Sequence, residues 1–354
     1  MSCAIPLALA ATIPVLSFRN INTMQNNRVY IRTATQISIQ QPLSEDWMTE
    51  PVMHHEPYVR SIDPAFRDWL NPLESRRMGK ILKRALVTAM KAMKDSGISQ
   101  PDAIMTGTGL GCIENTEIFL DQLCKDGEEM LKPTCFMQST HNTVSSLIAI
   151  YGQCHGYNST FSHKSISFDS ALLDAFLQLR LGDIRHALVT GNDEMTPSYF
   201  GILQRIGYVG QPGQVPAGEA SVAAMLTAES EHALCEIEDV KMFYDIDKVQ
   251  TVSSDVDAIL LGVNGDSNND SKYMELASRL PSVPLLRYKH VFGECYTSSA
   301  LGLYAAAQII ASGRIPDFMF MTPHEDNSVN IKRILVVNHS DGKDFSLITL
   351  KKID

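Results

Sequence analysis

Two serines stand where a nucleophile could work. Ser165 and Ser167 come directly before an apolar helix that stops at Gly182, and its apolar residues recur at helical spacing: Phe168, Leu172, Phe176 and Leu179. A side chain at the start of such a buried helix lies against unpaired backbone N–H groups and the positive end of the helix dipole. That environment activates a thiolate or holds an acyl oxyanion. Ser167 or Asp169 is expected to cap the first helical turn.

Two further groups could serve as base or nucleophile. His163 is close to Ser165 and Ser167, but it precedes them by only a few residues and no orienting carboxylate is identifiable. Cys295 is a spare nucleophile, although the neighbouring carboxylate of Glu294 would raise its pKa and make it less reactive. An active acyltransferase that uses Ser165, Ser167 or Cys295 stays open as an alternative.

The composition is that of a soluble globular protein. The 354 residues are 44% hydrophobic and 20% charged, which is enough for one large domain or two with a sizeable core. The formal charge of −10 argues against nucleic acid as a partner, because phosphate binding needs clustered Lys and Arg. The seven cysteines form no C-x-x-C pair and show no metal-ligand spacing. We therefore expect reduced thiols in the cytoplasm, no metal and no other cofactor.

The N-terminal segment is apolar from Ala4 to Phe18, but no Lys or Arg precedes it, so it is a poor signal peptide. It is short for a membrane-spanning helix and contains Pro6 and Pro14. We expect residues 1–28 to be an extension without structural consequence, with a secretion signal as the alternative, and we expect no membrane partner.

Strands and helices alternate in the elements that would position these groups. Strands are predicted at Val29–Ile39, Ala187–Gly191, Asp257–Gly262, Lys332–Asn338 and Phe345–Lys351, and the segment Ala103–Gly111 is predicted as a strand that runs into a glycine-rich turn. Helices are predicted at Glu74–Ser96, which ends at Gly97, and at Ser298–Ser312, which is rich in small residues. The glycines at the end of 103–111 lack the spacing of a phosphate-binding loop, so a structural role is favoured.

The helix 74–96 carries basic residues away from its apolar side: Arg76, Lys80, Lys83, Arg84, Lys91 and Lys94. We favour a solvated surface, since long charged side chains usually face water. A docking patch for an acidic carrier protein is the alternative.

The stretch around the serines resembles the nucleophile region of the β-ketoacyl synthases, condensing enzymes of the thiolase superfamily. In that family a cysteine ends a strand, and a helix, a Gly-Asp turn and a strand ending in Gly-Gly-Ala-Glu follow. This chain has Gly182-Asp183 at the turn and Gly191 to Glu194 at the strand end. Counting back without gaps places the family's cysteine at Ser165. No cysteine lies between Cys154 and Cys235.

By the same resemblance, both catalytic histidines of the family are replaced. The strand that ends in the family's His-Gly-Thr-Ser-Thr motif runs here into Asn264, whose amide cannot exchange a proton near neutral pH. The Lys-x-x-x-Gly-His motif corresponds to Lys289 through Glu294, so the lysine is retained and a carboxylate, which would oppose an enolate, replaces the histidine. We expect Lys289 and Glu294 to pair, and His290 to lie on a strand without a catalytic role. The segment 338–344 is expected to be a shorter loop, with one glycine, in place of the family's Gly-Phe-Gly-Gly-Thr-Asn loop.

The resemblance covers residues 29–352 and implies a thiolase-like α/β fold. Two duplicated βαβ-type halves, 29–230 and 231–354, would form a layered α-β-α-β-α sandwich. The helix 298–312 would take in the second half the place of the helix after Ser165.

What the resemblance implies about function is a catalytically degenerate subunit of the chain-length-factor type. Such a subunit pairs with an active ketosynthase in polyketide, aryl-polyene or fatty-acid-like chain elongation. We expect a heterodimer, with a homodimer possible, and an acyl carrier protein that binds through the partner. A polar cluster before an apolar run is expected to cap a helix and to line the dimer interface or the acyl tunnel: Phe136, Met137, Gln138, Ser139, Thr140, His141 and Asn142.

Overall fold

Helices and strands alternate along the chain in an order close to the predicted one. The computed structural model describes residues 26–128, 131, 133–249, 255–280, 282–322 and 331–353. Its strands are β1 (Val29–Ile37), β2 (Ala103–Gly107), β3 (Tyr157–Phe161), β4 (His186–Asp193), β5 (Ala220–Thr227), β6 (Cys235–Phe243), β7 (Ala258–Leu261), β8 (Leu285–Arg287), β9 (Arg333–Ser340) and β10 (Lys343–Lys351). Its α-helices are α1 (Pro72–Ser75), α2 (Lys80–Ser96), α3 (Ile113–Asp126), α4 (Pro133–Ser139), α5 (Thr143–Gly152), α6 (Ser167–Leu181), α7 (Pro197–Arg205), α8 (Ser267–Ala277), α9 (Lys289–Phe292) and α10 (Ser298–Ser312).

The strands join into one hydrogen-bonded sheet with the order β3-β2-β4-β5-β1-β6-β10-β9-β7-β8. The order is repeated, because β8-β7-β9-β10-β6 corresponds element by element to β3-β2-β4-β5-β1. In each repeat the outer three strands are parallel and the inner pairs are antiparallel. The repeats meet where β1 and β6 pair antiparallel, from Val29 opposite Ile237 to Ile31 opposite Cys235.

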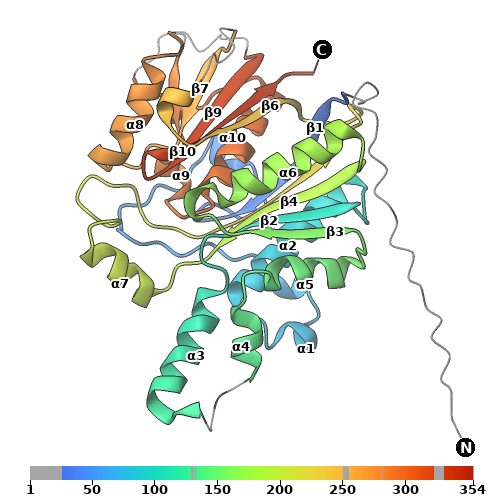
Figure 1. Ribbon diagram of the computed structural model, residues 1–354, viewed down its shortest axis with the longest axis vertical. Helices are drawn as coiled ribbons and strands as arrows, with labels where there is room; N and C mark the ends of the chain where they lie inside the picture. Colours follow the sequence, from blue (N-terminus) through green and yellow to red (C-terminus); the bar gives the residue numbers. More distant parts are fainter. Residues whose placement is uncertain are drawn as a thin grey trace, which may run out of the picture.

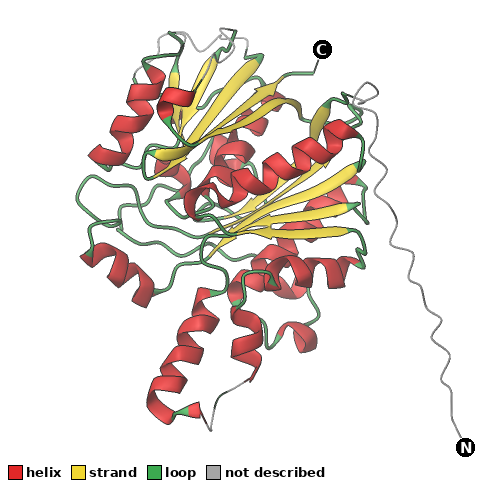
Figure 2. Cartoon of the chain, viewed as in Figure 1, coloured by secondary structure: helices red, strands yellow, loops and turns green. Residues whose placement is uncertain are grey.

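Helices pack on both faces of this sheet and between its two repeats (Figure 1). The central core combines residues of α6 and α10 with strand residues of both repeats. α2 and α5 form a second core on the outer face of the first repeat, and α8 forms a third on the outer face of the second. The layers therefore follow the expected order of helix, sheet, helix, sheet and helix (Figure 2).

The two central helices occupy equivalent places, since α6 connects β3 to β4 and α10 connects β8 to β9. α10 has the predicted bounds, and both helices end at a left-handed glycine, Gly182 with φ 73° and Gly313 with φ 68°. Small residues let α10 approach β4, because a Cβ on Gly191 would lie 2.8 Å from the Cβ of Ala300. Local signals thus fix the helix ends, and close packing holds the helices in the middle layer.

Two predicted boundaries are wrong. The helix predicted from Glu74 starts at Lys80, because Gly79 is its N-cap and the separate short helix α1 precedes it. The predicted loop 338–344 has one glycine as expected but is shorter still, because β9 and β10 extend into it and are joined by Asp341 and Gly342 alone. These two residues have φ angles of 52° and 74°, as the twist of a tight two-residue hairpin requires.

Of the predicted extension, residues 1–28, the first 25 lie outside the described residues. In the described part, the main-chain N–H of Asn27 donates to the carbonyl of Arg180 at 3.1 Å, so the last residues of the extension contact the end of α6. No helix in the described ranges is long and apolar enough to cross a membrane.

The basic residues of α2 have partners within the chain. Arg84 is only 1% exposed. Its guanidinium group pairs with Asp63 at 2.5 Å and with Glu219 at 3.0 Å. Two ammonium groups lie over aromatic rings, 5.9 and 5.8 Å from the ring centroids: Lys83 over Phe66 and Lys94 over Trp69. A solvated position is therefore the wrong prediction for Arg84, and these internal contacts give no support to a docking patch.

Candidate functional site

Three predicted site residues, Asn264, Lys289 and Glu294, form one hydrogen-bonded cluster. Lys289 Nζ lies 2.8 Å from Glu294 Oε2 and 3.1 Å from Oε1. Asn264 Nδ2 donates to Oε2 at 3.0 Å, and Ser298 Oγ donates to Oε1 at 3.3 Å. The predicted ion pair is present, and it is nearly enclosed, with side chains 5% and 12% exposed for Lys289 and Glu294.

The polar groups of this cluster bond to one another. The ammonium group of Lys289 balances the carboxylate of Glu294, and both carboxylate oxygens already accept hydrogen bonds. The amide of Asn264 does not exchange a proton near neutral pH. Removing one partner of such a buried pair would leave the other charge uncompensated.

The turn after β7 fixes the position of Asn264. Asp270 accepts the main-chain N–H groups of Asn264 and Gly265, each at 2.9 Å. Asn264 Oδ1 in turn accepts the N–H of Asp266 at 3.0 Å, so Asn264 caps this turn. Gly265 has a φ of 86° and lies against the carbonyl of Gly213, which leaves no room for a Cβ.

Two glycines bring the repeats together beside Glu294. The main-chain N–H of Glu294 donates to Pro216, and the N–H of Gly218 donates to Glu294, each at 2.8 Å. Gly293 has a φ of 81°, and a Cβ on it would lie 3.2 Å from the Cα of Gly218. This close approach gives both glycines a role that does not depend on the side chain at position 294.

Ser165 lies in a 3₁₀ turn, Lys164–Ile166, between β3 and α6. Its carbonyl accepts a hydrogen bond from Asn338 Nδ2 at 2.8 Å. Lys164, just before it, has a φ of 45° in the left-handed region, and its ammonium group lies 3.4 Å from Asp341. The β9–β10 hairpin thus holds the turn that carries Ser165.

The prediction that Ser167 or Asp169 caps α6 is wrong. Ser167 Oγ accepts the N–H of His163 at 2.8 Å and donates to the Lys164 carbonyl at 2.7 Å, so it closes the turn before the helix. Asp169 is fully buried and accepts from Ser299 Oγ at 2.7 Å and from Asn338 Nδ2 at 3.1 Å. Burial raises the pKa of Asp169, and these hydrogen bonds oppose the rise. Asp169 therefore links α6 to α10 and β9 across the central layer.

Among the residues that the structure describes, none is placed to activate the alternative nucleophiles Ser165, Ser167 and Cys295. Burial raises the pKa of the Cys295 thiol well above its usual value, and the nearby charges of Asp193 and Glu294 raise it further. The ring of His163 lies 3.8 Å from Asp344, and only its main-chain N–H bonds Ser167. In the described ranges, no imidazole is hydrogen-bonded to Ser165 or Ser167.

Two histidines near the site bond main-chain groups; His339 is buried and His290 is half-buried. His290 lies in the short helix α9 and not on a strand as predicted, with Nε2 2.9 Å from the carbonyl of Phe318. His339 on β9, which the sequence did not single out, accepts the N–H of Gly342 at 3.1 Å and lies 3.1 Å from the carbonyl of Asn269. Burial lowers the pKa of both imidazoles to about 4, so both are neutral near pH 7.

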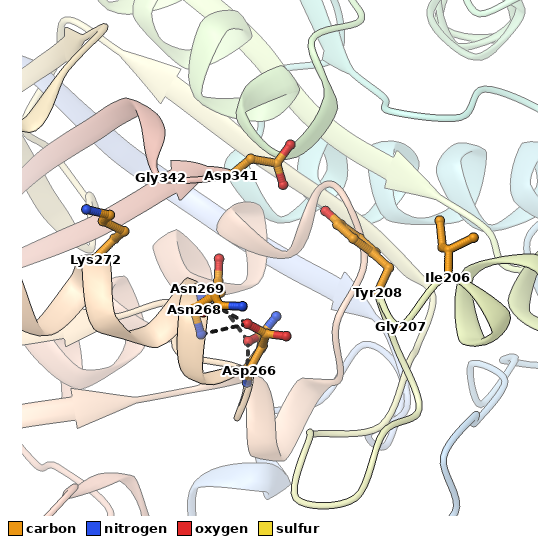
Figure 3. A pocket seen from close by; sticks show the side chains of 10 residues that line it. Ile206, Gly207, Tyr208, Asp266, Asn268, Asn269, Lys272, Asp341 and Gly342 are labelled. Atoms are coloured by element: carbon orange, nitrogen blue, oxygen red, sulfur yellow. Dashed lines mark hydrogen bonds between the residues drawn. The ribbon is translucent and has the colours of Figure 1, made fainter.

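A pocket of about 400 Å³ opens beside the cluster (Figure 3). Its walls come from the segment after α7, the start of α8 and the β9–β10 hairpin, and include Tyr208, Asn264 and Asp341. Burial raises the pKa of Tyr208 above its usual value, the charges of Glu294 and Asp341 raise it further, and a hydrogen bond with Ser165 opposes the rise. Tyr208 lines this pocket and is 37% exposed.

The predicted interface segment, Phe136–Asn142, spans the end of α4 and the turn before α5. Phe136 and Met137 are exposed, 57% and 70%. The predicted cap is wrong, because Asn142 is the N-cap of α5 but its side chain makes no capping hydrogen bond. Thr140 instead shares a 2.9 Å hydrogen bond with Thr143.

Two buried acids, Asp193 and Glu194, stand at the end of β4 and directly after it. Asp193 accepts the N–H groups of Gly109 and Leu110 at 3.0 and 2.9 Å, which supports the structural role predicted for the glycine-rich turn. Glu194 accepts the N–H of Glu114 at 3.0 Å. Burial raises the pKa of Asp193 to about 6 and that of Glu194 to about 7, and for Glu194 the charge of Glu114 adds to the effect.

Glu194 should make the protein less stable as pH rises. A carboxyl group whose pKa is raised in the folded state stabilises the fold fully below its unfolded pKa of 4.5 and loses that contribution as pH rises through about 7. We expect Glu194→Gln to remove up to about 3 kcal/mol of this dependence between pH 5 and pH 8. Urea unfolding at both pH values measures it, with exposed Glu50→Gln as the control. If Glu194→Gln has the same pH dependence of stability as the unsubstituted protein, the expectation is contradicted. His290 and His339 affect the pH dependence in the opposite direction, but they are present in both proteins, so their effect cancels in the comparison.

No group of His, Cys, Asp or Glu side chains in the described part of the chain is placed to hold a metal ion. Comparison with known families finds a match between residues 46–268 and the beta-ketoacyl synthase N-terminal domain. No curated protein sequence matches the chain.

Solved structures show the same fold at low sequence identity. The ishigamide ketosynthase/chain length factor superposes with a TM-score of 0.76 at 16% identity, covering 93% of this chain and 100% of that one. A beta-ketoacyl synthase from Burkholderia phymatum gives 0.77 at 13%, with the same coverage. A ketosynthase in complex with its chain length factor from Xenorhabdus doucetiae gives 0.71 at 12%, covering 93% and 99%. The thiolase-like fold is therefore confirmed.

Proposed function

Since this chain belongs to the β-ketoacyl synthase family, we propose that it is a catalytically degenerate subunit that pairs with an active ketosynthase. In this role it works as a chain-length factor in polyketide, aryl-polyene or fatty-acid-like elongation, and the carrier protein delivers acyl groups to the partner. The role of this chain in the complex is structural, and the partner supplies the nucleophile.

The cluster of Asn264, Lys289 and Glu294 is the observation that carries this proposal. Condensation needs a thiolate to accept the acyl group and groups that stabilise an enolate. Here position 165 carries a hydroxyl to which no imidazole of the described residues is hydrogen-bonded, and Glu294, paired with Lys289, stands where the resemblance places the family's second histidine. The cluster is packed and satisfied, as a structural element should be.

Printed descriptions of similar structures support the pairing. Two of them describe a ketosynthase with a chain length factor, and another describes a type II acyl-carrier protein in complex with its ketosynthase. These descriptions concern those proteins, and at 12–16% identity they carry over to this chain only as part of the proposal.

One face of the chain has features of a partner interface. Strand β3 is an edge of the sheet, paired with β2 on one side, and its first residues are exposed. Large apolar side chains are exposed on β3, α1 and the helices α3 to α5, including Leu73, Ile118, Leu120, Phe136, Met137, Ile150 and Tyr157. α3 and α4 project together from the body of the molecule (Figure 1). Open strand edges and clustered apolar side chains are what a partner covers.

A charged side chain introduced on this face should prevent pairing with the ketosynthase. We expect the chain to co-purify with an intact ketosynthase from its own genome, and Ile150→Asp to lower recovery of the complex about tenfold or more, as a buried interface residue would. Ile206→Asp is the matched control, because Ile150 and Ile206 are both 71% exposed but lie in different parts of the fold. Gel filtration of the co-expressed pair measures recovery.

The same preparation tests the degenerate site. Intact-mass analysis after incubation with acyl-carrier protein should show no acyl adduct on this chain. An adduct at Ser165, Ser167 or Cys295 would establish the active acyltransferase instead. The pairing would be contradicted if this chain stays a stable monomer in the presence of every candidate ketosynthase. It would also be contradicted if Ile206→Asp lowers recovery of the complex as much as Ile150→Asp does.

A further inference from the structure

Helices α3 and α4 form an arm that little packing holds to the body of the molecule. The two helices project together, and the rings of Phe119 and Phe136 lie 5.3 Å apart between them (Figure 1). Asn115 is the one buried residue of α3, and no residue of α4 is buried. Because few buried contacts fix the arm, its position depends on the hydrogen bonds at its base, where α3 begins.

Glu194 holds the first turn of α3. Its Oε1 accepts the main-chain N–H of Glu114 at 3.0 Å, and two residues later Thr196 Oγ1 donates to Glu117 Oε1 at 2.6 Å. The side chain of Glu194 is almost enclosed, since the residue is only 3% exposed. It borders a cavity of about 230 Å³, which is large enough to admit water. A change of charge on Glu194 therefore acts directly on the start of the arm.

The charges around Glu194 come from several elements. The charged side chains that line the same cavity are Glu114 and Glu117 of α3, Lys80 of α2, Arg60 between β1 and α1, and Glu219 just before β5. Burial raises the pKa of Glu194 most, and the charges of Glu114 and Glu219 raise it further. The charge of Arg84 opposes the rise, but this guanidinium group is already paired with Glu219 and Asp63. Lys80 lies 3.2 Å from Asp63, and the buried thiol of Cys112 is also close to Glu194.

We propose that Glu194 is a proton-dependent latch: its protonated side chain fixes α3 to the end of β4, and loss of the proton loosens the base of the arm. An ionised carboxylate inside a protein is costly unless it is paired or reaches water. Opening of the first turn of α3 lets water reach Glu194 and moves the charge of Glu114 away from it. The inference does not depend on the proposed function, because it concerns this chain alone and its test needs no partner.

Hydrogen exchange of the full chain tests the latch. The exchange of α3 is followed by peptide mass spectrometry and expressed as protection factors, which correct for the intrinsic effect of pH on exchange. The pKa of Glu194 is about 7 with the latch closed and is taken as 4.5 with α3 open. We therefore expect protection of α3 to fall about tenfold from pH 6 to pH 8. Glu194→Gln cannot ionise, so its protection of α3 should stay within about twofold over this range.

Two further variants separate the latch from a general loss of stability. Glu128→Gln, at an exposed position just after α3, is the matched control and should keep the tenfold fall. Glu114→Gln removes a like charge and should move the fall to lower pH, because the charge of Glu114 raises the pKa of Glu194. Continued protection of the buried helix α6 shows that each variant is folded.

The latch is overturned if protection of α3 in the unsubstituted chain does not change between pH 6 and pH 8. It is also overturned if Glu194→Gln shows the same fall as the unsubstituted chain. Should Glu194→Gln lose protection of α6, Glu114→Gln decides the question, and a fall at an unshifted pH in that variant overturns the latch.

Discussion

Replacing Glu294 by alanine should lower the free energy of unfolding by about 3–5 kcal/mol, because it leaves a buried ammonium group without its counter-charge. Lys289 is 5% exposed on its side chain, and Glu294 is its ion-pair partner at 2.8 Å. The double variant Glu294→Ala and Lys289→Met should regain much of the loss, since it removes the unpaired charge. Urea unfolding measures each value.

Asp95→Ala is the matched control for this effect. It removes the ion pair between Lys91 and Asp95, whose side chains are 24% and 40% exposed, and should cost less than about 1 kcal/mol. Equal losses of unfolding free energy in Glu294→Ala and Asp95→Ala would show that the buried cluster is not structural.

The proposed function adds a second expectation for Glu294→Ala. Turnover by the partner, normalised to the heterodimer recovered, should stay within a few-fold of the value without the substitution. A drop of about a hundredfold with the dimer intact would reopen this position as a catalyst.

Arg84→Met should cost a similar amount, about 3–5 kcal/mol, because Glu219 would lose its guanidinium partner inside the protein. The side chains of Arg84 and Glu219 are 2% and 6% exposed. Glu219 also accepts the N–H of Ser61 at 2.8 Å, so loss of the guanidinium group would loosen the segment around Ser61. The measurement is again urea unfolding, at low salt and at 1 M salt, where a buried pair is screened little.

Lys83→Met is the control for Arg84, one position away on the same helix. Its ammonium group lies over Phe66 at the surface, and its loss should cost less than about 1 kcal/mol. If Arg84→Met and Lys83→Met lower the free energy of unfolding by similar amounts, or if the Arg84→Met effect vanishes in 1 M salt, Arg84 behaves as a solvated surface residue.

The sequence by itself determined the features that depend on neighbours in the chain. The apolar spacing of α6 and α10 and the left-handed glycines Gly182 and Gly313 define where these helices end, because a helix stop is a local event. The alternation of strands and helices, with the resemblance of the motifs, gave the layered fold. Even the missed hairpin has a local signal, since Asp341-Gly342 is a dipeptide that favours a tight turn.

The tertiary structure alone decided where polar side chains go. Asp169 could cap its own helix by its position in the sequence, but it bonds Ser299, 130 residues away. Arg84 has the spacing of a surface residue, yet Glu219 from another segment makes its burial favourable. Asn264 and Glu294 came together for the same reason, across 30 residues. Buried polar groups must find partners, and the partner with the right distance and charge is set by packing, which sequence spacing does not contain.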